Sequence, residues 1–211
     1  MGKIKQGIMG GFAGKVGPVI GTSWKGKAVM RSRALSFNDR NSQAQQEQRA
    51  RFSIVIRFVS AIGGFISVGF RSRAVGMTAP NAAVSANIGE VITGTFPNYE
   101  IDYSKALVSA GSLDLPFNAQ ATVDSNTLSL TWADNSGMGT AKATDKVMIL
   151  IYNKTKNQSV SEFDVASRSE RTGSVTIPTA WNSDSVEVWL AMNSLDGTLT
   201  SKSAYLGSFT I

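Results

Sequence analysis

The feature that most constrains the fold is a series of short segments between residues 117 and 211 in which apolar and polar residues alternate. Turn signals rich in Asn, Asp, Ser or Gly separate them, and this spacing is typical of antiparallel sheets. Apolar side chains at every second position allow one face of each strand to be buried. Seven strands in this region indicate a β-sandwich. The predicted strands are Gln120–Val123, Thr127–Ala133, Lys146–Tyr152, Val160–Phe163, Ser174–Ile177, Val186–Met192 and Ser203–Thr210.

The stretch from Gly14 to Arg33 predicts a basic β-hairpin or extended arm. Two runs that can extend, Val16–Trp24 and Lys27–Arg33, flank the dipeptide Lys25-Gly26, which can form the turn. We interpret this hairpin either as the edge of a small sheet or as a surface for strand addition between protomers. Period two predicts that one face of the first run carries Val16, Pro18, Ile20, Thr22 and Trp24.

Residues 1–14 contain five glycines together with several apolar side chains. So free a backbone does not hold one conformation without a partner, and the segment is either a loose tail or an arm that becomes ordered on a neighbouring copy. The apolar side chains favour the arm, because a solvated tail has no need of them. The residues expected at the contact between protomers are Ile4, Ile8, Phe12, Val16, Val19, Ile20, Trp24 and Val29.

Positive charge is concentrated early in the chain. Residues 1–80 carry 13 Lys and Arg against two acidic residues, a net +11, whereas residues 81–211 carry eight basic and 13 acidic residues, a net −5. The basic part can meet nucleic acid, an anionic surface or the acidic face of another copy. The residues expected to contact such anions are Lys15, Lys25, Lys27, Arg31, Arg33, Arg49, Arg51 and Arg57.

Residues 42–73 predict a helix that Gly63-Gly64 kinks or breaks. Its apolar stripe recurs at helical spacing and is expected to be buried; it comprises Phe52, Val55, Ile56, Val59 and Ile62. Residues 80–92 predict a short second helix, and residues 99–109 a half-buried strand. A linker around residues 111–117 is expected to separate these elements from the sandwich.

Composition argues against catalysis. The chain has neither Cys nor His, which excludes disulfides, thiolate nucleophiles, imidazole bases and most zinc sites. No G-x-S-x-G spacing occurs, and the glycine-rich GIMGGFAG lacks the preceding strand and the Gly-Lys-Ser/Thr end of a phosphate loop. We interpret Asp134, Asp145 and Asp164 as solvated turn carboxylates rather than calcium ligands. We therefore predict that the chain is no enzyme and has no catalytic, cofactor-binding or metal-binding residues. We also predict no signal peptide and no transmembrane helix.

Two sets of motifs resemble known families. The segments LSLTWAD (Leu128–Asp134) and VEVWLAMNSLDGTLTS (Val186–Ser201) resemble fibronectin type III and other immunoglobulin-like modules, in which a tryptophan on the second strand fills the core. Four further segments are similar to an uncharacterised Bacteroidota family of unknown function: MGKIKQGIMGGFAGKVGPVIGTSWKG, the dipeptide Arg31-Ser32, QQEQRARF and GTFPNYEIDYSKALVSAG. More loosely, the GKVG…GK…RS segment followed by a Gln/Arg-rich helix resembles small structural or assembly proteins of Bacteroidota phages and prophages.

The sequence therefore predicts an α+β protein. Residues 1–115 are expected to form a basic N-terminal β-hairpin arm plus helices, and residues 116–211 a seven-stranded immunoglobulin-like β-sandwich. We expect a non-enzymatic structural protein, a phage virion component (capsid or tail) or related filament protein that forms homo-oligomers through its arm and contacts other virion proteins. The alternative is a nucleic-acid-binding protein that uses the basic half. We expect synthesis in the cytoplasm, followed by incorporation into a virion or an extracellular assembly.

Overall fold

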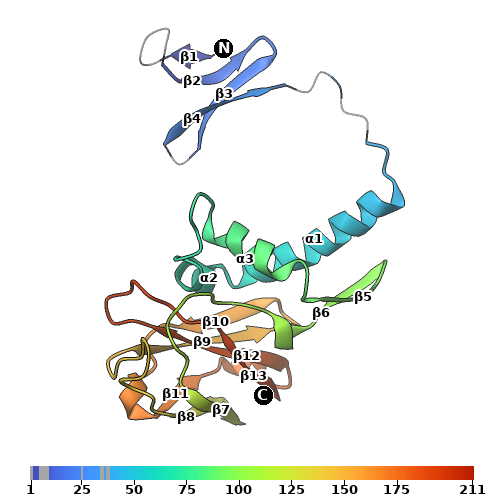
Figure 1. The fold of residues 1–211 in the computed structure, drawn as a ribbon. Helices are drawn as coiled ribbons and strands as arrows, with labels where there is room; N and C mark the ends of the chain where they lie inside the picture. Colours follow the sequence, from blue (N-terminus) through green and yellow to red (C-terminus); the bar gives the residue numbers. More distant parts are fainter. Residues whose placement is uncertain (1, 5–9, 25, 34–35, 37–38) are drawn as a thin grey trace. The chain divides into compact units, whose positions relative to one another are not determined.

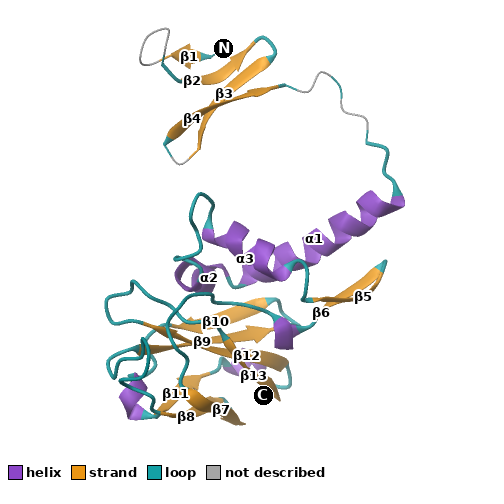
Figure 2. Cartoon of the chain, in the orientation of Figure 1, coloured by secondary structure: helices purple, strands orange, loops and turns teal. Residues whose placement is uncertain are grey.

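The computed structural model describes residues 2–4, 10–24, 26–33, 36 and 39–211. The chain forms two compact units, Met1–Ser42 and Gln43–Ile211, whose elements are drawn in Figures 1 and 2. We call them the N-terminal and the C-terminal unit. They differ from the segments expected from the sequence, residues 1–115 and 116–211, because the helices share a hydrophobic core with strands that follow residue 116.

The N-terminal unit is a four-stranded antiparallel sheet in the order β1-β2-β3-β4. Its strands are β1 (Lys3–Ile4), β2 (Phe12–Val16), β3 (Val19–Trp24) and β4 (Lys27–Ser32). The predicted hairpin is β3 with β4, but its first leg begins at Val19 rather than Val16. Gly17 and Pro18 form the turn between β2 and β3, and Gly17 has a positive φ of 55° that suits glycine. Pro18 therefore needs no ladder bond.

Three helices open the C-terminal unit: α1 (Gln43–Ala61), α2 (Gly63–Gly69) and α3 (Ala79–Asn87). The predicted long helix breaks just before Gly63-Gly64, and the axes of α1 and α2 differ by 85°. Two of the five stripe residues are not buried, since Phe52 is 45% and Ile56 38% exposed. The helix meets the core with its C-terminal half, where its buried residues lie; they are Val55, Phe58 and Val59.

No single helix among residues 39–211 is long and apolar enough to cross a membrane. Helices α1 and α2 reach that length and composition only when taken together across their bend.

Short strands make up the rest of the C-terminal unit. All seven predicted strands of the C-terminal half are present. The strands are β5 (Ile92–Thr95), β6 (Asn98–Ile101), β7 (Phe117–Asp124), β8 (Thr127–Ala133), β9 (Lys146–Asn153), β10 (Gln158–Glu162), β11 (Thr172–Thr176), β12 (Ser185–Asn193) and β13 (Ala204–Thr210). The strand predicted over residues 99–109 ends at Ile101, because a 3₁₀ turn over Tyr103–Lys105 follows it. Strand β5, which pairs with β6, was not predicted.

The C-terminal unit has three layers (Figure 1). The middle sheet has the strand order β10-β9-β12-β13, and the outer sheet the order β11-β8-β7. Along β9, Val147, Ile149 and Ile151 enter the core between the two sheets. The intervening Met148 and Leu150 enter the core beneath the helices. The middle sheet is therefore buried on both faces, which explains why β9 and β12 are almost continuously apolar.

The segment predicted as a linker, residues 111–117, largely belongs to a partly buried connector, residues 106–116, between the helices and the outer sheet. The Ser109 hydroxyl donates to the Ser201 carbonyl over 2.6 Å, and the Leu113 amide donates to the Thr200 carbonyl over 2.9 Å. A side chain at Gly111 would collide with the same Thr200 carbonyl. The connector is thus packed against the loop that joins β12 to β13.

Candidate interaction surface

The N-terminal sheet has almost no interior. Of its described residues only Gly21 is buried, and none belongs to either hydrophobic core of the chain. All six residues of β4 are exposed, and the outer edge of β4 pairs with no described strand. Units of about 40 residues or fewer usually need a disulfide, a metal ion or association with another surface to be stable.

The strand register sorts the side chains of this sheet by charge. Residues paired across strands lie on the same face, and Lys15, Ile20 and Arg31 form one such row across β2, β3 and β4. The face with this row, the cationic face, comprises Lys3, Ala13, Lys15, Ile20, Thr22, Trp24, Lys27, Val29 and Arg31. The opposite, uncharged face comprises Phe12, Gly14, Val16, Val19, Gly21, Ser23, Ala28, Met30 and Ser32. All described cations within the strands therefore lie on one side of the sheet.

The strand register places the residues expected at the contact between protomers on both faces of the sheet. The prediction that Val16 shares a face with Ile20 and Trp24 is wrong, because the Gly17-Pro18 turn reverses the chain after Val16. The uncharged face carries Phe12, Val16 and Val19, and the cationic face carries Ile20, Trp24 and Val29. Ile4 pairs with Phe12 in the ladder, and Ile8 lies outside the described residues.

The residues expected to contact anions are also divided. The cationic face holds Lys15, Lys27 and Arg31, joined by Lys3, which the sequence did not single out. Arg33 follows β4, and its amide donates to the Pro18 carbonyl; Lys25 lies outside the described residues. The other three, Arg49, Arg51 and Arg57, lie on α1 in the C-terminal unit.

Arg51 and Arg57 on α1 lie near the β5–β6 hairpin of their own unit. The Arg51 guanidinium lies 5.1 Å from the centroid of the Tyr99 ring on β6, a cation–π distance. Arg57 lines a hollow of about 280 Å³ together with Pro97 and Tyr99. These arginines therefore belong to the contact between α1 and the β5–β6 hairpin.

The uncharged face combines protruding apolar side chains with a hollow. A side chain at Gly21 would meet the Phe12 ring, so the ring lies over bare backbone. Val16 and Met30 are 53% and 70% exposed. Beside them is a hollow of about 240 Å³ lined by Gly10, Gly11, Phe12, Ala28, Val29 and Met30.

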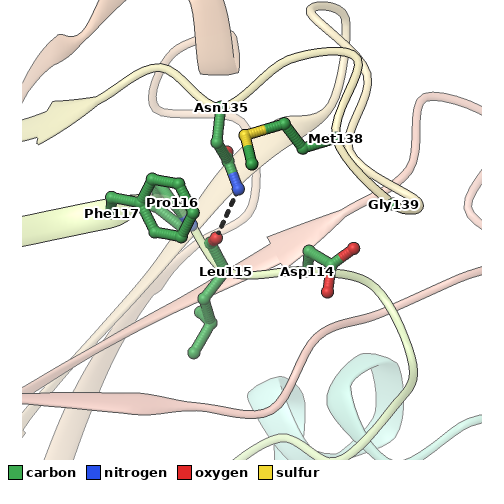
Figure 3. Close-up of a pocket in the computed structure, with 7 residues that line it drawn as sticks. All are labelled: Asp114, Leu115, Pro116, Phe117, Asn135, Met138 and Gly139. Atoms are coloured by element: carbon green, nitrogen blue, oxygen red, sulfur yellow. Dashed lines mark hydrogen bonds between the residues drawn. The ribbon is translucent and has the colours of Figure 1, made fainter.

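A larger hollow, about 430 Å³, lies where the connector enters β7 (Figure 3). In it, the Asn135 side-chain amide donates to the Leu115 carbonyl over 2.9 Å. Hydrogen bonds from the Thr140 amide and hydroxyl lower the pKa of the Asp114 carboxyl. Exposed Phe117 and Met138 complete the lining. The lining residues offer one carboxylate and apolar surface, but no nucleophile beside a base.

A buried ion pair stabilises the loops behind this hollow. Arg168 and Asp145 are both fully buried, with Nη2 of the arginine 3.0 Å from Oδ2 of the aspartate. Arg168 also donates to the Asn135 side chain and the Asp114 carbonyl, and its own carbonyl accepts from the Trp132 indole. The prediction that Asp145 is a solvated turn carboxylate is therefore wrong. Its role is to neutralise a cation that links three loops.

A second buried carboxylate, Glu187 on β12, lies on the helix side of the middle sheet. It accepts from the Tyr205 hydroxyl over 2.6 Å, from Lys154 over 3.1 Å and from the Ser208 hydroxyl over 3.1 Å. Burial, together with the Glu187 carboxylate, raises the pKa of the Tyr205 hydroxyl. Both carboxylate oxygens are used within the chain, so this cluster is structural.

No group of three or more acidic side chains that could hold a metal ion occurs in the part of the chain that the structure describes. No curated protein matches the chain. The model of a family of unknown function, DUF6266, matches residues 11–207. This match begins just before β2 in the N-terminal unit and ends within β13. The chain therefore belongs to the DUF6266 family of unknown function.

Proposed function

We propose that this protein is a non-enzymatic structural protein that self-associates through the uncharged face of its N-terminal sheet. The observation that carries the proposal is that the described part of this sheet has two faces and an unpaired β4 edge but almost no interior. Oligomerisation is the usual route to stability for so small a unit when it has no disulfide or metal.

A second copy of the same face is the occupant that the chemistry favours. The uncharged face carries no ionisable side chain, so two copies can approach without charge repulsion. Val16 and Met30 protrude from it, and the hollow beside Phe12 can receive an apolar side chain of the facing copy. Pairing two copies through β4 edges in one continuous sheet is less favourable, because it extends a face that already carries Lys27 and Arg31.

The strand order of the C-terminal unit supports a finer assignment for residues 117–211. If β7 to β13 are lettered A, B, C, C′, E, F and G, the outer sheet reads E-B-A and the middle sheet C′-C-F-G, the arrangement of an immunoglobulin-like sandwich. Trp132 on the second strand enters the core between the sheets. We assign this region to the fibronectin type III kind; an experimental structure with β11 paired to β12 would contradict the assignment.

The resemblance of the opening motif to Bacteroidota phage and prophage proteins suggests a setting, a component of a virion or related filament made in the cytoplasm. In that setting the N-terminal sheet would join copies, and the C-terminal unit would be presented to other virion proteins. Electron microscopy of the purified protein at high concentration tests the setting: rings, tubes or shells are expected, and only isolated particles would contradict it.

Self-association is tested by light scattering after size exclusion, on the full chain and on the double variant Val16→Glu/Met30→Glu. Facing copies would bury these carboxylates against each other, so the dissociation constant is expected to rise at least about 100-fold. The matched control is Val75→Glu/Met138→Glu, which changes two exposed apolar residues of the C-terminal unit and should leave the oligomer intact. A monomeric full chain, or an unchanged oligomer in the first variant, would refute the proposal.

A further inference from the structure

We propose that the cationic face of the N-terminal sheet binds single-stranded nucleic acid, with Trp24 as the residue on which a base stacks. This face is opposite to the uncharged face, so two copies that associate through the uncharged face leave it free to bind. It assigns to Trp24 a role in binding a polyanion rather than in contacting another protomer.

The first argument is the arrangement of charge around an apolar strip. Ile20, Thr22 and Trp24 follow one another along the face of β3, the central strand on which the face is built. Lys15 on β2 and Arg31 on β4 flank Ile20 directly, about 10 Å apart across the sheet. A cation is thus placed on either side of the strip, where it can meet the phosphates of a strand whose bases lie along β3.

The second argument is the lack of any competing anion. The first acidic residue of the chain is Asp39, after seven Lys and Arg. No ion pair involves the four cations of this face within the described residues. The charge of the face is therefore available to a polyanion from outside the unit.

The third argument is the exposure of Trp24. It is 50% exposed, whereas Trp132, Trp181 and Trp189 are at most 5% exposed. Its strand partner is Lys27, so an indole and an ammonium group lie side by side. An exposed aromatic ring on a basic sheet face is the arrangement on which single-stranded bases stack. A duplex offers no free base faces, which favours a single strand.

The test uses the full chain and a short oligodeoxythymidine of about 12 nucleotides, with intrinsic fluorescence as the readout. Because Trp24 alone is exposed among the four tryptophans, stacking should quench its emission and protect it from acrylamide. Four cations predict a slope of log K against log salt of about −3, so that affinity falls roughly 50-fold between about 0.05 and 0.2 M salt.

Two sets of variants locate the site. Trp24→Ala should weaken binding about 5- to 150-fold, while Trp24→Phe should retain most of it. Lys27→Glu/Arg31→Glu should abolish binding. Lys142→Glu/Lys202→Glu makes the same change in net charge at exposed positions of the C-terminal unit and should change binding little. Circular dichroism checks that each variant remains folded.

Several results would overturn the proposal. One is unchanged affinity in Trp24→Ala; another is an equal loss in the two charge-reversal variants, which would indicate a general effect of net charge. Binding of phosphatidylserine vesicles or polyglutamate as tightly as the oligonucleotide would assign the face to an anionic surface or acidic protein instead. Equal affinity for duplex DNA would exclude stacking as its basis.

Discussion

Replacing Phe58 by Ala should destabilise the entire C-terminal unit rather than the helices alone. The Phe58 side chain on α1 is 2% exposed. Its ring centroid lies 5.2 Å from that of Tyr152 on β9 and 6.0 Å from that of Trp189 on β12. The side chain therefore joins the helical layer to the two central strands of the middle sheet. On the opposite face of β9 and β12, every second side chain lies in the core between the middle and outer sheets.

The expected loss is large relative to the stability of a typical domain. Truncating a buried Phe to Ala costs about 3–5 kcal/mol, against a total free energy of unfolding of about 5–15 kcal/mol. Phe52 is a matched control on the same helix, since it is 45% exposed. Replacing it by Ala should change the free energy of unfolding by no more than about 0.5 kcal/mol.

The assay is urea unfolding combined with native-state hydrogen exchange. In Phe58→Ala, the amides of α1 and of β8 in the outer sheet should lose the same free energy of protection, because both belong to one cooperative unit. The reasoning would be refuted if α1 lost protection while β8 kept its wild-type value. That result would mean that residues 1–115 and 116–211 fold independently, as the sequence alone suggested.

Three further predictions concern the C-terminal unit. Arg168→Met leaves the buried Asp145 carboxylate without its cation and should lower the free energy of unfolding, measured by thermal unfolding, by about 3–5 kcal/mol. A decrease below about 1 kcal/mol, the size expected for a surface substitution, would contradict the role assigned to this ion pair. Hydrogen bonds from Ser194 and Thr198 lower the pKa of Asp196 to about 2. The stability that these bonds give the β12–β13 loop is therefore complete above the ordinary carboxyl pKa of about 4 and is lost as the pH falls through about 2. NMR titration of Asp196 should find this lowered pKa rather than one near 4. Gly111→Ala should destabilise the unit by about 1–3 kcal/mol, because the new methyl group meets the Thr200 carbonyl, whereas Gly89→Ala has open space and serves as the control in chemical denaturation.

The strands of the C-terminal unit were predictable because alternation is a local signal. Leu128, Leu130 and Trp132 alternate with polar residues, and all three enter the predicted core. The sequence of β9 carries a further signal, since Lys146–Asn153 is almost continuously apolar, which indicates burial on both faces. That run therefore predicts a second layer packed against the other face of the middle sheet.

Two other features could not be read from local pattern. Which face Val16 occupies depends on where the turn falls, and a shift of one residue moves a whole strand's side chains to the other face. The sorting of charge in the N-terminal sheet follows from that register. The buried Arg168 had no signal either, because an arginine between serines is typical of an exposed loop and its partners are distant in the sequence.

Hydrogen exchange of residues 10–33 at different protein concentrations tests the central claim most directly. If a second copy completes the N-terminal sheet, the amides of β2, β3 and β4 should be protected at high concentration and exchange freely after dilution below the dissociation constant, while protection of residues 43–211 stays constant. Equal protection of these strands in dilute solution and in Val16→Glu/Met30→Glu would contradict the account, because the sheet would then be stable within a single chain.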